Sequence, residues 1–183
     1  MSGSGEHRTG ADAPVGQGAR PGDGDTQAAA RTAEAIPLLE LTLADCERVL
    51  GTDHPDTLTS RNNLAAAYQD AGRTAEAIQL YERTLTDRER LLGPGHPDTL
   101  MSRNNLAAAY HAAGRTADAI RLFEPTLADR ERLLGTDHPD TLMSRNNLAA
   151  AYHAAGRTAD AIRLFERTLA GHERLLGLSL IHI

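Results

Sequence analysis

The sequence predicts an all-α protein in which pairs of antiparallel helices stack into a solenoid. The first observation is a repeat, because residues 73–114 and 115–156 align without a gap and are identical at 35 of 42 positions. The second is that each repeat holds two segments with helical spacing of apolar residues, and each segment ends at a glycine. Such a period is typical of proteins whose units bury their apolar faces only against neighbouring units.

The first half of each repeat opens with His-Pro-Asp-Thr and ends with Ala-Gly. Pro55 fits the first helical position, where its missing N–H costs nothing. Asp56 places negative charge near the positive end of the helix dipole, and Gly72 suits a C-terminal stop. We therefore interpret His-Pro-Asp as the start of a helix rather than as part of a metal site.

The second half of each repeat carries an apolar stripe, seen as Ile78, Tyr81 and Leu85 in the first copy. Their spacing predicts an amphipathic helix that ends near Gly93. Residues 87–90 alternate in charge, which is typical of a solvated helix face. One position is always small, and these residues should let the paired helices approach closely: Ala77, Ala119 and Ala161.

The chain divides into a leader, a repeat region and a tail. The leader is rich in Gly and Pro and lacks apolar periodicity, so we expect it to be disordered, either as a non-functional extension or as a regulatory segment. The tail breaks the repeat and is expected to be non-native, the alternative being a short apolar tail. The predicted boundaries are 1–25 for the leader, 26–177 for the solenoid (a lone helix 31–50, then pairs 54–92, 96–134 and 138–176) and 178–183 for the tail.

Two prolines interrupt the helical pattern of the second halves. Pro37 replaces Gln79 of the next copy, and Pro125 replaces Arg83. A proline inside a helix removes one backbone hydrogen bond and costs roughly 3 kcal/mol. We therefore expect a bend, or a local loss of helix regularity, between residues 121 and 125.

Composition argues against several function classes. The net charge of −6 disfavours binding to nucleic-acid phosphates. Neither a signal peptide nor an apolar run of membrane-spanning length is visible, so a cytoplasmic protein without membrane contact is expected. The single Cys46 aligns with Arg88 of the next copy, which predicts a solvated position. All 19 basic residues are Arg, which we interpret as the codon bias of a GC-rich, actinobacterial genome.

Nothing in the sequence predicts catalysis, a cofactor or a metal. The histidines recur one repeat apart and lack the close spacing of metal ligands. The chain has no Lys and therefore no Gly-x-x-x-x-Gly-Lys phosphate loop. Ser60 and its equivalents fall inside predicted helices rather than on a nucleophile turn. We expect a protein that is not an enzyme.

The strings Asn-Leu-Ala-Ala-Ala-Tyr, Ala-Gly and Ala-Glu-Ala-Ile-Gln-Leu-Tyr resemble a tetratricopeptide repeat. The 42-residue period, with His-Pro-Asp-Thr, Asn-Asn-Leu-Ala and Leu-Leu-Gly, is similar to the kinesin light chain type. The resemblance covers about residues 31–177 and implies a right-handed α-solenoid. The sequence departs from the family where a bulky residue often stands early in the first helix, since this chain has Arg61 there.

The resemblance implies that the first helix of each repeat lines a concave groove that holds an extended peptide. Asparagine suits this role because its amide offers one acceptor and two donors. The alternative is that one Asn of each pair bonds between adjacent repeats and orders the stack. Replacing Asn104 and Asn146 by Ala is expected to weaken a partner without unfolding the protein. The groove positions are Asn62, Asn63, Gln69, Met101, Asn104, Asn105, His111, Met143, Asn146, Asn147 and His153.

Two function hypotheses follow. The first is a non-catalytic scaffold that binds an extended peptide or a partner domain in the groove. The second is the sensor or regulatory arm of a longer signalling protein, for example a nucleotide-hydrolysing switch, of which this chain is a fragment. Uncapped solenoid ends would favour self-association in either case. The near-identity of the repeats indicates either a repetitive ligand or recent duplication.

Overall fold

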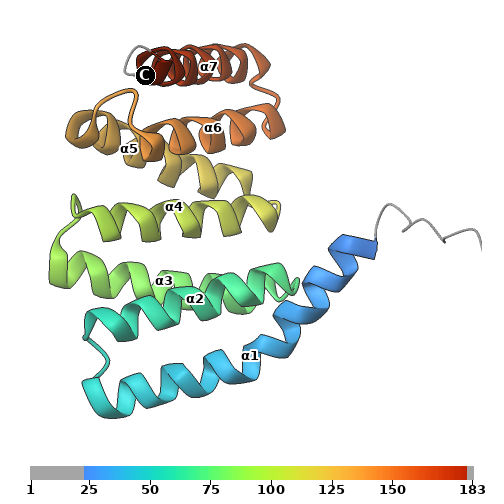
Figure 1. Cartoon of the computed structure of the whole chain (residues 1–183), viewed down its shortest axis with the longest axis vertical. Coiled ribbons are helices and arrows are strands. Elements are labelled where there is room, and N and C mark those ends of the chain that lie inside the picture. The colour runs from blue at the N-terminus through green and yellow to red at the C-terminus, as the bar shows by residue number, and fades with distance from the viewer. Residues whose placement is uncertain (1–22, 181–183) are drawn as a thin grey trace, which may run out of the picture.

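The computed structural model describes the backbone of residues 23–180 and the side chains of residues 34–177. Within this range the chain forms seven helices and no strand, which confirms the all-α fold class (Figure 1). Residues 1–22 and 181–183, which hold most of the predicted leader and the end of the predicted tail, lie outside the described part. The helices are α1 (Asp23–Leu50), α2 (Pro55–Asp70), α3 (Thr74–Leu92), α4 (Pro97–Ala112), α5 (Thr116–Leu134), α6 (Pro139–Ala154) and α7 (Thr158–Leu180).

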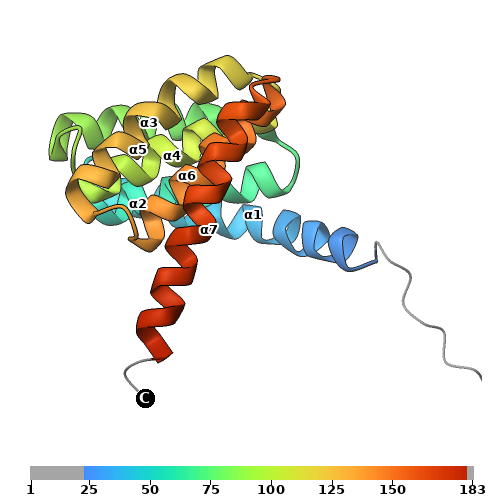
Figure 2. The same ribbon diagram turned by 90° about the horizontal axis from the view of Figure 1, so that it is seen from above.

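The helices stack in chain order, each antiparallel to the one before it (Figure 1). Each packs mainly against its immediate neighbours, and Figure 2 shows from above how successive layers overlie one another. We call α2, α4 and α6 the A-type helices and α1, α3, α5 and α7 the B-type helices. A stack of this kind depends on contacts between neighbouring units rather than on one central core.

Each A-type helix starts at the His-Pro-Asp sequence, as predicted. The Nδ1 atom of His54 accepts a hydrogen bond from the backbone N–H of Asp56 at 3.2 Å, and Pro55 is the first helical residue. His96 and His138 make the same contact in the next two copies. At the other end Gly72 adopts a φ of 75°, a left-handed conformation that glycine accepts without strain. The local sequence therefore sets the boundaries of these helices.

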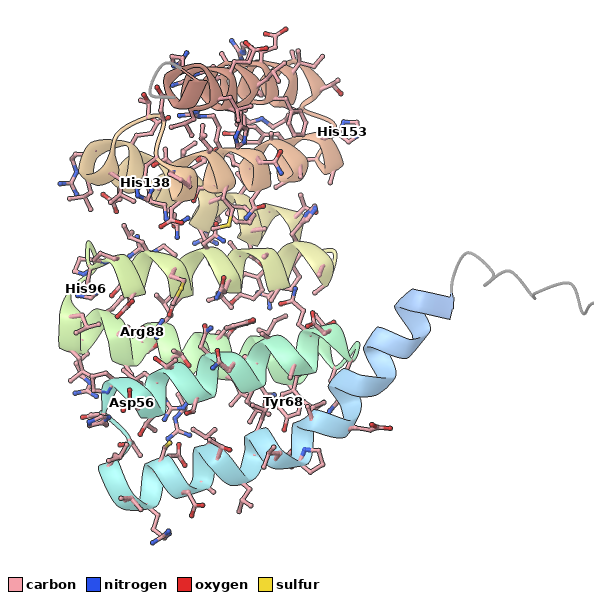
Figure 3. The ribbon with its side chains drawn as sticks, viewed as in Figure 1. Asp56, Tyr68, Arg88, His96, His138 and His153 are labelled. Atoms are coloured by element: carbon pink, nitrogen blue, oxygen red, sulfur yellow. The ribbon has the colours of Figure 1, made fainter. Side chains whose placement is uncertain are left out.

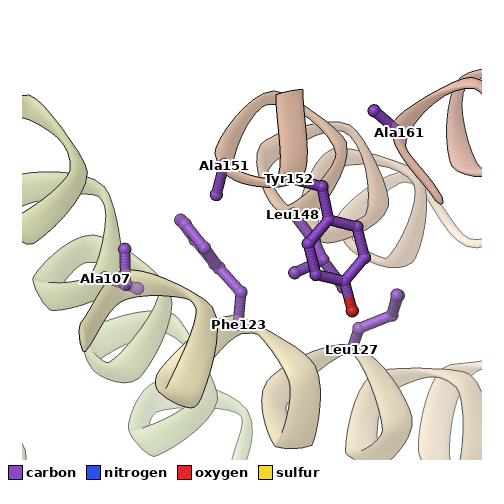
Figure 4. Close-up of a cluster of buried hydrophobic side chains, with 8 residues drawn as sticks. Ala107, Phe123, Leu127, Leu148, Ala151, Tyr152 and Ala161 are labelled. Carbon is purple, nitrogen blue, oxygen red and sulfur yellow. The ribbon is translucent and has the colours of Figure 1, made fainter. Parts of the chain in front are cut away.

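The apolar core consists of clusters that run from layer to layer. The cluster of Figure 4 brings Phe123 and Leu127 of α5 against Leu148 and Tyr152 of α6. Small residues allow this approach: the predicted close-contact residues Ala77, Ala119 and Ala161 are at most 1% exposed. Each cluster therefore spans three or more successive helices, so neighbouring helices complete the core together.

A buried arginine follows each helix start and forms ion pairs across the layers. Arg61 is 0% exposed, and its guanidinium lies 3.0 Å from Glu47 of α1 and 2.7 Å from Asp87 of α3. Arg103 repeats this between Glu89 at 2.8 Å and Asp129 at 3.5 Å. Each arginine replaces the bulky residue expected at this position and ties one A-type helix to the B-type helices on both sides.

The prediction of a solvated face for residues 87–90 was wrong. Arg88 is 2% exposed, while Asp87 and Glu89 are the partners of the buried arginines. Glu89 and Arg90 are exposed as predicted, and Arg90 pairs with Asp53 at 2.6 Å. Tertiary packing brings acids and bases of different helices together here, which their alternation along one helix could not indicate.

Cys46 likewise departs from its predicted solvated position. It is half-buried, and its Sγ lies 3.6 Å from Oγ of Ser60. In the next copy the equivalent Arg88 bonds to the equivalent Ser102 at 2.8 Å. Cys46 therefore occupies an inward-facing position that holds an arginine elsewhere in the chain.

The two prolines have different surroundings. Helix α1 starts at Asp23, eight residues before the predicted start at residue 31, contains Pro37, and changes direction along its length (Figure 1). Helix α5 remains helical from Thr116 to Leu134 with Pro125 inside it, so the expected loss of helix regularity does not occur there. Helix α5 packs between α4 and α6, and it stays helical although Pro125 cannot donate a backbone hydrogen bond.

Candidate peptide-binding groove

The A-type helices lie side by side on one face of the stack. Helix α4 contacts α6, which is two elements further along, and no comparable contact joins two B-type helices in the described part of the chain. Since the A-type helices are closer together than the B-type helices, they form the inner side of the curve. The predicted groove residues therefore share one face, and their exposure differs along it.

The predicted groove residues fall into three groups. Asn62 and Asn104 are buried, at 8% and 4% exposed. The half-buried members are Gln69, Asn105, His111 and Asn147, and the exposed members are Asn63, Met101, Met143, Asn146 and His153. Figure 3 shows His153 on the right side of the stack and His96 and His138 on the left side, at the opposite ends of their helices. The groove residues thus extend along the whole length of the A-type helices.

A ladder of asparagine side chains connects adjacent A-type helices. Nδ2 of Asn105 donates to Oδ1 of Asn62 at 3.2 Å, and Nδ2 of Asn147 donates to Oδ1 of Asn104 at 3.4 Å. Oγ of Ser144 also donates to Oδ1 of Asn104 at 3.4 Å. Asn62 and Asn104 therefore form hydrogen bonds between adjacent repeats, which was the alternative to ligand binding for these two residues. Asn105 and Asn147 each keep an amide oxygen that accepts no hydrogen bond from a described residue.

A hollow of about 210 Å³ lies between α2 and α4 on this face. Ala66 and Ala108 leave the space open because their side chains are short, and Tyr81 of α3 contributes to its lining. Burial raises the pKa of Tyr81 to about 12, so its phenol stays protonated at neutral pH. Gln69 and Asn105 add amide groups to the lining. The hollow therefore combines amide groups, a phenol and the carboxylate of Asp70 with small apolar walls.

Other residues near this face were not predicted from the sequence. Arg88 and Arg130 of the B-type helices donate to Ser102 and Ser144 of the following A-type helices, at 2.8 and 2.7 Å. Figure 3 shows Arg88 on the same side of the stack as His96. The sequence does hold a signal for this contact, because an Arg is followed by a Ser 14 residues later in two copies.

The described residues show neither a metal centre nor a membrane span. No group of three or more His, Cys, Asp or Glu side chains in this part of the chain is arranged to hold a metal ion. Among the described helices, none combines the length and the apolarity that crossing a bilayer requires.

Comparison with known proteins decides the family. The model of the family described as tetratricopeptide repeat matches residues 25–90, 62–128 and 98–174. The chain belongs to the tetratricopeptide repeat family. No curated protein sequence matches it at a comparable level of significance.

Solved structures of tetratricopeptide repeat proteins resemble the chain closely. One is a protein of Podosopora anserina described as a kinesin light chain with nearly identical TPR-like repeats; it is 36% identical with a TM-score of 0.68, and the match covers 81% of this chain and 71% of that one. Its Q17M variant is 34% identical with a TM-score of 0.71, over 82% and 71% of the two chains. BtubC (BKLC) from P. vanneervenii is 25% identical with a TM-score of 0.72, over 81% and 59%. The repeats are therefore of the kinesin light chain type, and tetratricopeptide repeats generally serve as non-catalytic protein-interaction scaffolds.

Asn104 and Asn146 provide a matched test of the ladder, because they occupy the same repeat position but only Asn104 is buried. Asn104→Ala removes the acceptor of Ser144 and Asn147, so we expect the free energy of unfolding to fall by about 1–2 kcal/mol. Asn146→Ala should change it by less than about 0.5 kcal/mol. Urea unfolding followed by circular dichroism measures both. Equal losses for the two variants would show that the ladder does not stabilise the stack.

Proposed function

We propose that the chain is a non-catalytic scaffold that binds an extended peptide, or an extended segment of a partner domain, along the face of the A-type helices. The observation that carries the proposal is the row of exposed and half-buried amides beside the hollow at Ala66 and Ala108. The free amide oxygens of Asn105 and Asn147 are available to accept backbone N–H groups of a ligand. Such contacts would be largely independent of the ligand's side chains.

Asn62 and Asn104 take a different role in this proposal from Asn63 and Asn146. The first two hold the ladder in register, because their oxygens already accept hydrogen bonds from the neighbouring helix. The exposed Asn63 and Asn146 remain proposed ligand contacts, together with Asn105, Asn147, Gln69, His111, His153, Met101 and Met143. A peptide bound there would cross several repeats, which suits an extended conformation.

The test uses a peptide selected from a random library against the intact chain. The double variant Asn63→Ala/Asn146→Ala should weaken its Kd at least tenfold, which corresponds to about 1.4 kcal/mol. As a matched control, Arg83→Ala/Arg121→Ala removes two exposed side chains from B-type helices and should change Kd less than twofold. Isothermal titration calorimetry measures both. If the control variant weakens peptide binding and the groove variant does not, the peptide binds outside the groove.

A second candidate function is the regulatory arm of a longer signalling protein, and the outward face of α7 favours it. Phe165 and Leu169 are 40% and 61% exposed, whereas their equivalents Phe123 and Leu127 are 1% and 7% exposed because α6 covers them. A groove of about 630 Å³ runs along this face. Such a surface suits a further A-type helix or another protein surface, including that of a second copy. The gene sequence on either side separates an arm from an independent scaffold.

Exposure of this face also generates a prediction about self-association. Sedimentation velocity of the intact chain should show concentration-dependent association, and Leu169→Glu should abolish it, because a charge cannot be buried there without a partner. Arg163→Glu, at an exposed position of the same helix, serves as the control and should leave association unchanged. A wild-type chain that stays monomeric at high concentration would rule out this self-association.

A further inference from the structure

A cavity of about 410 Å³ opens where the N-terminal ends of α4 and α6 meet the C-terminal end of α5. It lies on the side of the stack that carries His96 and His138 in Figure 3. The lining is mostly apolar, and Met101, Leu133, Leu134 and Met143 are all large hydrophobic residues that remain at least 36% exposed. We call it the Gly95 cavity after the loop residue at its edge.

The Gly95 cavity has a counterpart of about 630 Å³ one repeat further on, where Pro139, Met143 and Leu175 occupy the equivalent positions, but its loop residue departs from the repeat. Asp53 and Asp137 occupy the position equivalent to Gly95, and each pairs at 2.6 Å with an arginine of a B-type helix, Arg90 or Arg174. Gly95 has no carboxylate, so the equivalent Arg132 pairs instead with Asp129 of its own helix at 3.1 Å. The ion pair of the other two loops is therefore missing here, and the loop beside Leu133 carries no carboxylate.

The cavity contains a buried cation whose hydrogen-bonding capacity is not filled. Arg130 is 3% exposed, and its Nη1 donates to the carbonyl oxygen of Asp140 at 2.9 Å and to Ser144 at 2.7 Å. Its Nη2 has no hydrogen-bond partner among the described residues. In the previous copy, Nη2 of Arg88 reaches the hydroxyl of Thr59 at 3.5 Å. Met101 replaces Thr59 at the Gly95 cavity, so no hydroxyl is present there for Arg130.

Charge around the cavity favours a neutral acceptor over an anion. Asp98 and Asp140 belong to the lining, so the cavity contains two acidic residues and one basic residue. An added anion would be repelled by both carboxylates. Burial also lowers the pKa of Arg130, as expected for a charge with incomplete compensation. A carbonyl oxygen would complete the hydrogen bonds of Nη2 without adding negative charge.

We propose that the Gly95 cavity binds a large apolar residue of a peptide ligand, such as Leu, Met or Phe, with a backbone carbonyl oxygen of that ligand accepting a hydrogen bond from Nη2 of Arg130. The inference rests on the proposed function, because Met101 and Met143 also belong to the proposed groove. It adds a side-chain preference that the amide row alone does not provide. The third repeat has His172 at the position of Arg130, so the described part of the chain holds this arrangement once.

The chain's methionines allow a direct test. It has three, of which Met101 and Met143 line the cavity while Met1 belongs to the N-terminal end of the chain. The intact chain labelled with methyl-¹³C methionine is titrated with N-acetyl-leucinamide, which carries an apolar side chain and neutral carbonyls. Both cavity signals should shift saturably, with a Kd on the order of millimolar for so small a ligand, and the Met1 signal should not move. N-acetyl-glycinamide should produce no saturable shift.

The variants copy residues found in the first repeat. Gly95→Asp restores the carboxylate of Asp53; a Cβ there would meet only Leu133, at 4.0 Å, so the fold should persist. We expect it to weaken fragment binding at least fivefold. Met101→Thr copies Thr59 and should weaken fragment binding by a similar factor, measured from the methyl signal of Met143. Asp53→Gly is the matched control in the first repeat and should leave fragment binding at the two methionines unchanged.

Several outcomes would overturn the proposal. A shift of Met143 without Met101 would place the fragment in the groove beside α7, which Met143 also lines. Unchanged binding in Gly95→Asp would contradict a site that depends on an uncharged loop residue at position 95. Tighter binding of N-acetyl-leucine than of its amide would contradict a neutral acceptor. Since the titration uses no partner peptide, its failure leaves the groove test intact, and failure of the groove test leaves the fragment result intact.

Discussion

A buried guanidinium ties each A-type helix to its neighbours, and the stack depends on it. Arg145 is 1% exposed and lies 2.7 Å from Glu131 of the preceding helix, while it also donates to the carbonyl oxygen of Thr136 in the loop between them. Removing a charge from water is costly unless its partners are held in place. The arginine is therefore tolerated only when the acid of the preceding helix arrives in register. This requirement favours one relative position of successive repeats over other positions that would bury similar apolar area.

The same logic separates the residues that hold the stack from those free to bind. Asn62 and Asn104 are used between repeats, whereas Asn63 and Asn146 are left on the surface. Departures from the repeat then make one repeat differ from the others. Gly95 removes the loop ion pair that Asp53 and Asp137 form, and the cavity beside it contains Arg130, where the next repeat has His172. A nearly periodic scaffold can thus carry a site that is not periodic.

The sequence predicted the fold and the helix starts because both depend on local chemistry and on the period. His54 and Pro55 cap and start a helix through contacts within three residues. Burial was harder to predict because it depends on what packs in the next layer. Asn104 and Asn146 lie in stretches of identical sequence, yet the first is 4% exposed and the second is exposed. Arg88 appeared solvent-facing in its charged block, and only the neighbouring helix with Ser102 explains its burial.

The most direct test of the account is a double-mutant cycle on Glu131 and Arg145, using Glu131→Gln, Arg145→Met and the double variant. Urea unfolding gives the coupling free energy, which should be at least about 1.5 kcal/mol if the buried pair holds the layers together. The exposed pair Asp45–Arg48 provides the reference and should couple by about 0.5 kcal/mol or less. A coupling of Glu131 and Arg145 no larger than this reference would contradict the central role of the buried guanidinium.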